Sequence, residues 1–152
     1  MSKWYQNITG LSSTIPEMNS RRLDFGMCSL AGCIFVAGGY QNDLGVLDKC
    51  EIYSFESREW TEAAGMNTKR SGFNLIFFEN KIWAIGGYSS INKNLDTIET
   101  YDLVENRWTS INVRLQMRRS CYGAAVHKNK IFVVGGITHG ETLSSVEVYL
   151  FF

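Results

Sequence analysis

The sequence lacks the features that mark several large classes of protein. Lys plus Arg and Asp plus Glu number 15 each, so the formal charge is zero and no basic field favours a nucleic-acid backbone. The longest apolar stretches, such as 75–78 and 131–134, are far shorter than the roughly 20 residues of a membrane span. Residues 1–6 lack the apolar core of a secretory signal. We therefore expect a cytoplasmic protein that binds neither nucleic acid nor membranes.

Groups for metal binding and catalysis are also scarce. The only histidines are His127 and His139, and the four cysteines form no CxxC pair. Nucleophile-elbow, paired-histidine and triad patterns are absent. We expect no metal, no other cofactor and no enzymatic activity. The cysteines are interpreted as small buried hydrophobes, with Cys33 at a hairpin tip left open as a redox-sensitive thiol.

What the sequence does contain is a repeated phrase, an apolar run that ends in two glycines. Three copies recur about 50 residues apart, a spacing typical of repeat architectures. The pairs are Gly38 and Gly39, Gly86 and Gly87, and Gly135 and Gly136. Because no Walker lysine or GxGxxG pattern accompanies them, they do not predict a phosphate site. We interpret them as scaffold positions where backbone approaches backbone closely.

Other residues recur at fixed places around the glycine pairs. An arginine precedes each pair, followed by an aromatic residue, an apolar run and a turn with Gly or Asn, which predicts a tight β-hairpin. A polar loop and a third strand with a Glu-x-Tyr pattern follow. The recurring aromatic residues, predicted to pack between sheets, are Tyr53, Tyr101, Tyr149, Trp60 and Trp108. The unbroken apolar second strand predicts sheets that are covered on both faces.

This order of residues resembles the Kelch motif, and 66–73 is similar to the start of a blade in the Kelch-like ubiquitin-ligase adaptors. The resemblance implies an all-β fold of Kelch-type β-propeller blades with four antiparallel strands each. About three blades are present, half of a six-bladed ring. The expected divisions are an outer strand of a preceding blade at 1–12, which includes Trp4, blades at 18–62 and 66–112, and a blade lacking its outer strand at 115–152.

Half a ring would expose apolar faces and unpaired strand edges at its two ends. Two alternatives would relieve this exposure. Two chains could form a homodimer that completes a six-bladed ring, or the sequence could be a fragment of a longer protein. The fragment is the favoured expectation, because no ligase-recruiting domain precedes the repeats.

The resemblance also implies partner-binding residues. In the adaptors, arginines at the start of the innermost strand help bind substrate segments, which assigns Arg22, Arg70 and Arg119 to an acidic peptide. The alternative is that these arginines pair within the blades, with Glu51, Glu99 and Glu147. On the binding interpretation, Arg70→Ala weakens peptide binding with little loss of stability, whereas Gly87→Val disrupts the fold.

The loops between the second and third strands are the other candidate, because binding residues often lie on loops held by a rigid scaffold. Their polar and aromatic residues are Tyr40, Gln41, Asn42, Tyr88, Ser89, Asn92, Lys93, Thr138 and His139. By the same resemblance, three positions at the entry to the third strand are added: Lys49, Thr97 and Ser145. The alternative for each of these residues is an ordinary solvated loop position.

Three functions remain open at this point. The leading hypothesis is a non-catalytic protein-interaction module, the substrate-recognition domain of a cullin-RING ubiquitin-ligase adaptor. Its partner would be a protein or an acidic peptide segment. The second hypothesis is an actin-binding cytoskeletal scaffold. The third is a Kelch-fold enzyme of the sugar oxidase or isomerase type, which the scarcity of histidine disfavours.

Overall fold

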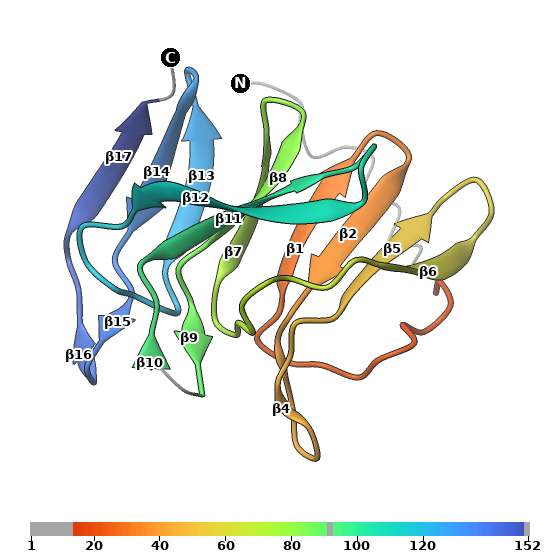
Figure 1. Ribbon diagram of the computed structural model, residues 1–152, viewed down its shortest axis with the longest axis horizontal. Coiled ribbons are helices and arrows are strands. Elements are labelled where there is room, and N and C mark those ends of the chain that lie inside the picture. The colour runs from red at the N-terminus through yellow and green to blue at the C-terminus, as the bar shows by residue number, and fades with distance from the viewer. Residues whose placement is uncertain (1–13, 91–92, 151–152) are drawn as a thin grey trace, which may run out of the picture.

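The described part of the protein is built around three larger antiparallel β-sheets that lie side by side in chain order (Figure 1). The computed structural model describes residues 14–90 and 93–150. The predicted outer strand at 1–12, with Trp4, and the loop residue Asn92 lie outside the described residues. Residues 14–90 and 93–150 contain no helix with the length and hydrophobicity needed to cross a membrane.

The three sheets share one strand order. The first sheet runs β1 (Gly26–Leu30), β2 (Cys33–Ala37), β5 (Cys50–Ser54), β6 (Glu59–Ala63). The second runs β7 (Asn74–Phe78), β8 (Lys81–Ile85), β11 (Thr97–Asp102), β12 (Arg107–Arg114). Within the described residues, the third has three strands, β13 (Gly123–His127), β14 (Lys130–Val134) and β17 (Val146–Leu150). The all-β prediction is therefore confirmed.

The predicted hairpins are present in all three sheets. β1 pairs with β2, β7 with β8 and β13 with β14, each antiparallel across a two-residue turn. In the second and third hairpins both turn residues have positive φ, Glu79 at 49° and Asn80 at 57°, and Lys128 at 46° and Asn129 at 59°. This is the backbone of a type I′ turn, whose twist matches that of the flanking strands.

The polar stretches after the glycine pairs are better ordered than simple loops. Each forms a short two-stranded ribbon: β3 (Tyr40–Gln41) with β4 (Gly45–Val46), β9 (Tyr88–Ser89) with β10 (Lys93–Asn94), and β15 (Ile137–Thr138) with β16 (Glu141–Thr142). The labelled ribbon strands lie at the same end of the three sheets, the lower end in Figure 1.

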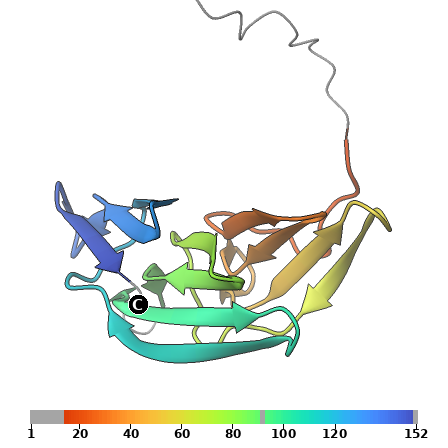
Figure 2. The same ribbon diagram turned by 90° about the horizontal axis from the view of Figure 1, so that it is seen from above.

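The second sheet packs through both of its faces, and the first and third sheets each pack on it through one face. We call the face toward the preceding sheet the leading face and the opposite one the trailing face. The trailing face of the first sheet packs on the leading face of the second, with Phe35, Ala37 and Cys50 against Ile82, Ala84, Tyr101 and Trp108. The trailing face of the second sheet packs on the third in the same way, with Trp83, Ile85 and Ile98 against Ile131 and Val133. Figure 2 shows this stacking from above.

The recurring aromatic residues lie in two places. Some lie at the contacts between neighbouring sheets, which we call joints, and the others lie on the leading face of the first sheet. The rings of Phe35 and Tyr101 are 4.8 Å apart, and Trp108 is buried in the same cluster. Tyr149 is partly buried against the second cluster. These three residues thus lie at the contacts between sheets. Tyr53 and Trp60 instead pack on each other, 5.3 Å apart, on the leading face of the first sheet.

The glycine pairs lie where segments of the chain approach one another closely, Gly38 against the segment that enters the next sheet and Gly87 against the segment that enters its own sheet. A Cβ on Gly38 would lie 2.4 Å from the Arg70 carbonyl oxygen, and a Cβ on Gly87 would lie 2.8 Å from the Cβ of Phe73. Both glycines also have positive φ, at +60° and +101°. A side chain is excluded at these two positions by space and by backbone conformation together.

Candidate functional site

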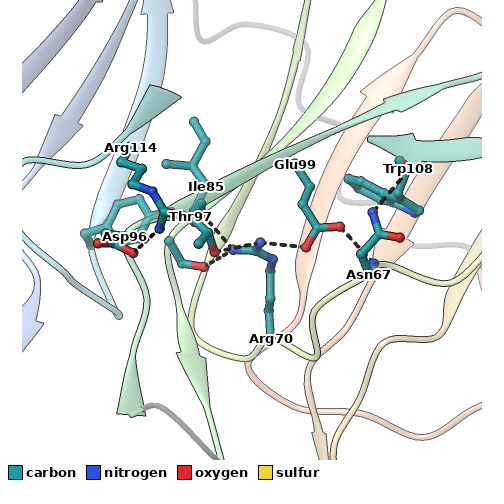
Figure 3. A network of polar contacts seen from close by, with 10 residues as sticks. Asn67, Arg70, Ile85, Asp96, Thr97, Glu99, Trp108 and Arg114 are labelled. Atoms are coloured by element: carbon teal, nitrogen blue, oxygen red, sulfur yellow. Dashed lines mark hydrogen bonds and ion pairs between the residues drawn. The ribbon is translucent and has the colours of Figure 1, made fainter. Parts of the chain in front are cut away.

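The second sheet contains a buried ion pair at the start of its innermost strand (Figure 3). The Arg70 guanidinium donates to a Glu99 carboxylate oxygen at 2.7 Å, and the two side chains are 0% and 1% exposed. The same guanidinium donates to the carbonyl oxygens of Gly86 at 2.8 Å and Thr97 at 3.0 Å, and to the Thr97 hydroxyl at 3.1 Å. The other Glu99 oxygen accepts the Asn67 backbone N–H at 2.8 Å. The charges are thus enclosed by partners of the chain itself.

The first and third sheets repeat this arrangement. Arg22 pairs with Glu51, and Arg119 pairs with Glu147, with arginine side chains that are 0% exposed. Burial by itself raises the pKa of Glu147. Hydrogen bonds from Tyr149 and from the N–H groups of Gln116 and Met117, together with the Arg119 charge, lower that pKa below its ordinary value. The carboxylate therefore stays ionised beside its arginine.

These contacts decide between the two interpretations of the arginines. A guanidinium with no exposed surface cannot grip a carboxylate on a partner unless its internal pair breaks. The structure shows the alternative, pairing within each sheet, in place of a ring of free cations. The three positions added at the entry to the third strand serve the same network. The Lys49 carbonyl, the Thr97 carbonyl and hydroxyl, and the Ser145 carbonyl and hydroxyl accept from these arginines.

The ribbons carry the exposed candidates. Tyr40 and Tyr88 occupy the same position in successive repeats and are 37% and 41% exposed, and Ile137, 36% exposed, takes that position in the third. Each is held by a backbone bridge to the segment that enters its own sheet, Leu23 with Tyr40, Ser71 with Tyr88 and Ser120 with Ile137. Three apolar or aromatic side chains are therefore presented from a fixed backbone.

Two shallow pockets lie beside these side chains. One, of about 300 Å³, is lined by Arg21, Tyr40, Asn42 and Asp43, among others. The other, of about 340 Å³, brings Tyr88 and Lys93 of the second sheet together with Ile137 and His139 of the third. The structure thus gathers Tyr88 and His139, which are far apart in the sequence, at one site.

Three copies of the Kelch motif match the chain, over residues 21–67, 69–112 and 118–150. The chain belongs to the Kelch repeat family. Its three sheets are Kelch blades, and this agrees with the resemblance seen in the sequence. Among curated proteins, no relative matches the chain.

Two of the predicted binding residues in this Kelch domain lie apart from the exposed side chains of the ribbons. Ser89 is only 5% exposed, because its side chain points inward from the β9–β10 ribbon, so it is not available to a partner. Lys49 is exposed but lines a separate pocket of about 260 Å³ with Glu51 and Glu62.

A second set of basic residues was missed by the sequence reasoning. Arg21, Lys69 and Arg118 are exposed and directly precede the three buried arginines. Arg21 lines the Tyr40 pocket, and Arg118 lies 3.5 Å from Asp96. Reading the position before each arginine in repeat register would have found them. We define the loop face of this Kelch domain by its exposed side chains: Arg21, Tyr40, Asn42, Lys69, Tyr88, Lys93, Arg118, Ile137 and His139.

The metal-binding potential and the thiols of the Kelch domain can be judged from its described residues. In 14–90 and 93–150, His, Cys, Asp and Glu side chains do not gather in threes where they could hold a metal ion. Burial raises the pKa of the Cys33 thiol, and burial followed by the nearby Cys33 raises that of Cys28 to about 12. Both thiols are therefore protonated at neutral pH, which argues against a redox-sensitive Cys33.

Proposed function

We propose that this Kelch domain is a non-catalytic recognition module that binds a protein partner through its loop face. The observation that carries the proposal is the repeated exposure of Tyr40 and Tyr88 at one position of successive blades. Tyrosine gives a large contact area at a small cost in conformational entropy and keeps a hydroxyl for a hydrogen bond. The buried ion pairs hold the backbone that presents these rings, so little ordering is needed on binding.

The charge of the loop face supports an acidic partner segment. With the paired arginines enclosed, the exposed cations of the loop face are Arg21, Lys69, Lys93 and Arg118, and all but Lys93 recur at one position of each blade. Their order along the blades matches an extended peptide that crosses several loops. Arginine can grip a carboxylate with two parallel hydrogen bonds, which also fixes the direction of the peptide. The acidic partner remains a proposal, but its recurring cations are different residues from those expected from the sequence.

A peptide-display selection tests the surface directly. The wild-type chain is the bait, and selected peptides are measured against Tyr40→Ala, Tyr88→Ala and the combined loop variant. We expect each truncation to weaken binding by about 5- to 30-fold, corresponding to about 1–2 kcal/mol. Phe55→Ala is the matched control, since Phe55 is 53% exposed and follows β5 at the opposite end of the first sheet. Equal binding by the loop variant and the wild type would remove the loop face as the site.

The finer proposal is that the recognised partner is a substrate of a cullin-RING ubiquitin ligase, as the resemblance to the Kelch-like adaptors suggests. Proximity labelling in cells, with and without inhibition of cullin neddylation, tests it. Substrates should be lost with the tyrosine variant and should accumulate when neddylation is blocked. Co-sedimentation with actin filaments tests the scaffold alternative. Binding to filaments that depends on Tyr40 and Tyr88, without any effect of the inhibitor, would favour that alternative.

A further inference from the structure

The trailing face of the third sheet carries exposed apolar side chains, and no other element in 14–90 or 93–150 covers them. Val134, Val146, Val148 and Leu150 are 47%, 54%, 47% and 51% exposed. The pairings of Val134 with Val146 and of Phe132 with Val148 place these side chains on one face of β14 and β17. This is an exposed sheet surface of a kind that soluble proteins usually cover.

Equivalent positions in the other two sheets are buried by the next sheet in the chain. Ala37 and Ile85, which correspond to Val134, are 0% and 1% exposed. Cys50 and Ile98, which correspond to Val146, are 2% and 1% exposed. The repeat itself therefore identifies the surface that fits this face, which is the leading face of another Kelch blade.

Gly123 points to the same occupant. At the equivalent Gly26, an added Cβ would lie 2.7 Å from a Leu75 side-chain carbon, because the next sheet packs directly on that strand. A Cβ on Gly123 would meet no atom closer than the Val134 oxygen at 4.0 Å, and Gly123 has no positive φ that requires glycine. Among the described residues, none fills the space above this glycine, whereas a further blade would.

Backbone hydrogen bonds supply a second line of evidence. Four of them cross the joint between the first and second sheets: Gly39 N–H to Arg70 O at 2.7 Å, Arg70 N–H to Leu47 O at 3.0 Å, Met66 N–H to Asp48 O at 2.9 Å and Gly72 N–H to Asp24 O at 2.7 Å. The next joint repeats them: Gly87 N–H to Arg119 O at 2.8 Å, Arg119 N–H to Leu95 O at 3.2 Å, Leu115 N–H to Asp96 O at 2.8 Å and Cys121 N–H to Gly72 O at 2.7 Å.

The two ends of the described chain carry matching halves of such a joint. At the trailing end the corresponding groups are Gly136 N–H and the carbonyls of Leu143, Ser144 and Cys121. At the leading end they are the Arg22 carbonyl and the N–H groups of Arg22, Met18 and Asp24. Among residues 14–90 and 93–150, none of these eight groups makes a hydrogen bond. The trailing end thus offers one donor and three acceptors, and the leading end offers the complementary one acceptor and three donors.

The leading face of the first sheet is open at its inner edge. Met27 is 59% exposed, whereas the equivalent Leu75 is 6% exposed under the first sheet. Phe25, Ile34 and Trp60 are half-buried, and Val36 and Tyr53 are already covered. By the geometry of the first joint, Met27 of one copy would fill the space above Gly123 of another.

We propose that the trailing face of the third sheet binds the leading face of the first sheet in a second copy of this chain. Two copies related by a two-fold axis would form both joints at once and close a ring of six blades. Such a contact is head to tail, so closure is what prevents it from growing into an open filament. The loop faces of both copies would then lie on the same side of the ring.

Sedimentation velocity over a dilution series tests the proposal, with four variants that change exposed positions. Gly123→Val fills the vacant space with a residue that favours strands, so we expect its thermal stability to be retained and its dimer to be lost. Val148→Lys and Met27→Lys place a charge in the trailing and the leading face, and both should sediment as monomers. Val104→Lys is the control, because Val104 is 95% exposed in the turn between β11 and β12. Circular dichroism melting confirms that each variant folds.

The expected result is a wild-type species of about twice the 17.2 kDa chain mass, retained by Val104→Lys and lost in the other three. A monomer at all concentrations would overturn the proposal and leave the face to a blade of another polypeptide. A dimer that survives both Gly123→Val and Val148→Lys would place the contact elsewhere. Larger open assemblies would refute ring closure. None of these outcomes depends on the loop face, so peptide binding through Tyr40 and Tyr88 is judged separately.

Discussion

Replacing Arg70 with alanine should destabilise the fold strongly, contrary to the expectation from the sequence. The variant would leave the Glu99 carboxylate buried without its cation, while one Glu99 oxygen would keep only the Asn67 N–H. It would also leave the carbonyls of Gly86 and Thr97 without this donor. Removing one partner of a buried ion pair costs about 3–5 kcal/mol. Since a domain of this size is stable by about 5–15 kcal/mol, the loss is a large fraction of the total.

The assay is thermal and urea unfolding followed by circular dichroism. For a chain of this length the loss corresponds to a fall in Tm of roughly 6 to 20 °C. Lys69→Ala is the control, because Lys69 is the exposed residue next to Arg70, and it should change the free energy of unfolding by less than about 0.5 kcal/mol. The double variant Arg70→Met with Glu99→Leu should lose less than the sum of the single changes, because no charge stays unpaired. A loss below about 1 kcal/mol in Arg70→Ala would refute the structural role of the pair.

Three further predictions follow from the joints, the carboxylates and the thiols. Gly87→Val should cost about 3 kcal/mol or more, because its φ of +101° and the nearby Phe73 both exclude a side chain; Gly140→Ala, at φ +86° in open space, should cost less in the same melts. The pKa of Glu147 is lowered in the fold, so its contribution to stability is present above about pH 4.5 and is lost as the pH falls through that lowered pKa; Glu147→Gln should flatten the acid limb of a stability profile, and an unchanged slope would contradict this. Burial raises the pKa of Cys50 to about 12, so a thiol reagent at pH 8 should label the exposed Cys121 first and Cys50 only after unfolding.

The repeat, the hairpins and the glycine scaffold could be predicted from the sequence because each is determined by local pattern. A glycine pair, a two-residue turn and an apolar strand report their own backbone requirements. The direction of the Arg70 side chain is different, because the same sequence interval to Glu99 is compatible with a cation that binds a partner or with an ion pair inside the sheet. What decides is the path of 66–70 between two sheets, which brings the guanidinium beneath the carbonyls of Gly86 and Thr97. That path depends on how the first and second sheets pack together, and neither sheet's sequence alone determines it.

Ser89 is a second residue whose side-chain direction the sequence pattern could not predict. Whether a residue in a polar stretch faces solvent depends on whether that stretch pairs with itself. The pairing of β9 with β10 alternates the side chains, so Tyr88 turns outward and Ser89 inward. Two residues are too few for an alternation to be recognised in sequence. The exposed Arg21, Lys69 and Arg118 recur at one position of the repeat, so they could be predicted from the sequence. The binding role was instead assigned to the arginine that follows each of them.

The buried ion pairs are connected to the exposed tyrosines through a short stretch of backbone. The Arg70 guanidinium binds the carbonyl of Gly86, and two residues later the chain presents Tyr88 to solvent. The same connection joins Arg22 to Tyr40 through Gly38, and Arg119 to Ile137 through Gly135. An arginine that looks like a binding residue therefore acts on the backbone that carries one. Loop residues such as Asn42 and His139 can change without disturbing the ion pairs, because their side chains take no part in them. Recognition can thus vary from blade to blade while the network beneath it stays the same.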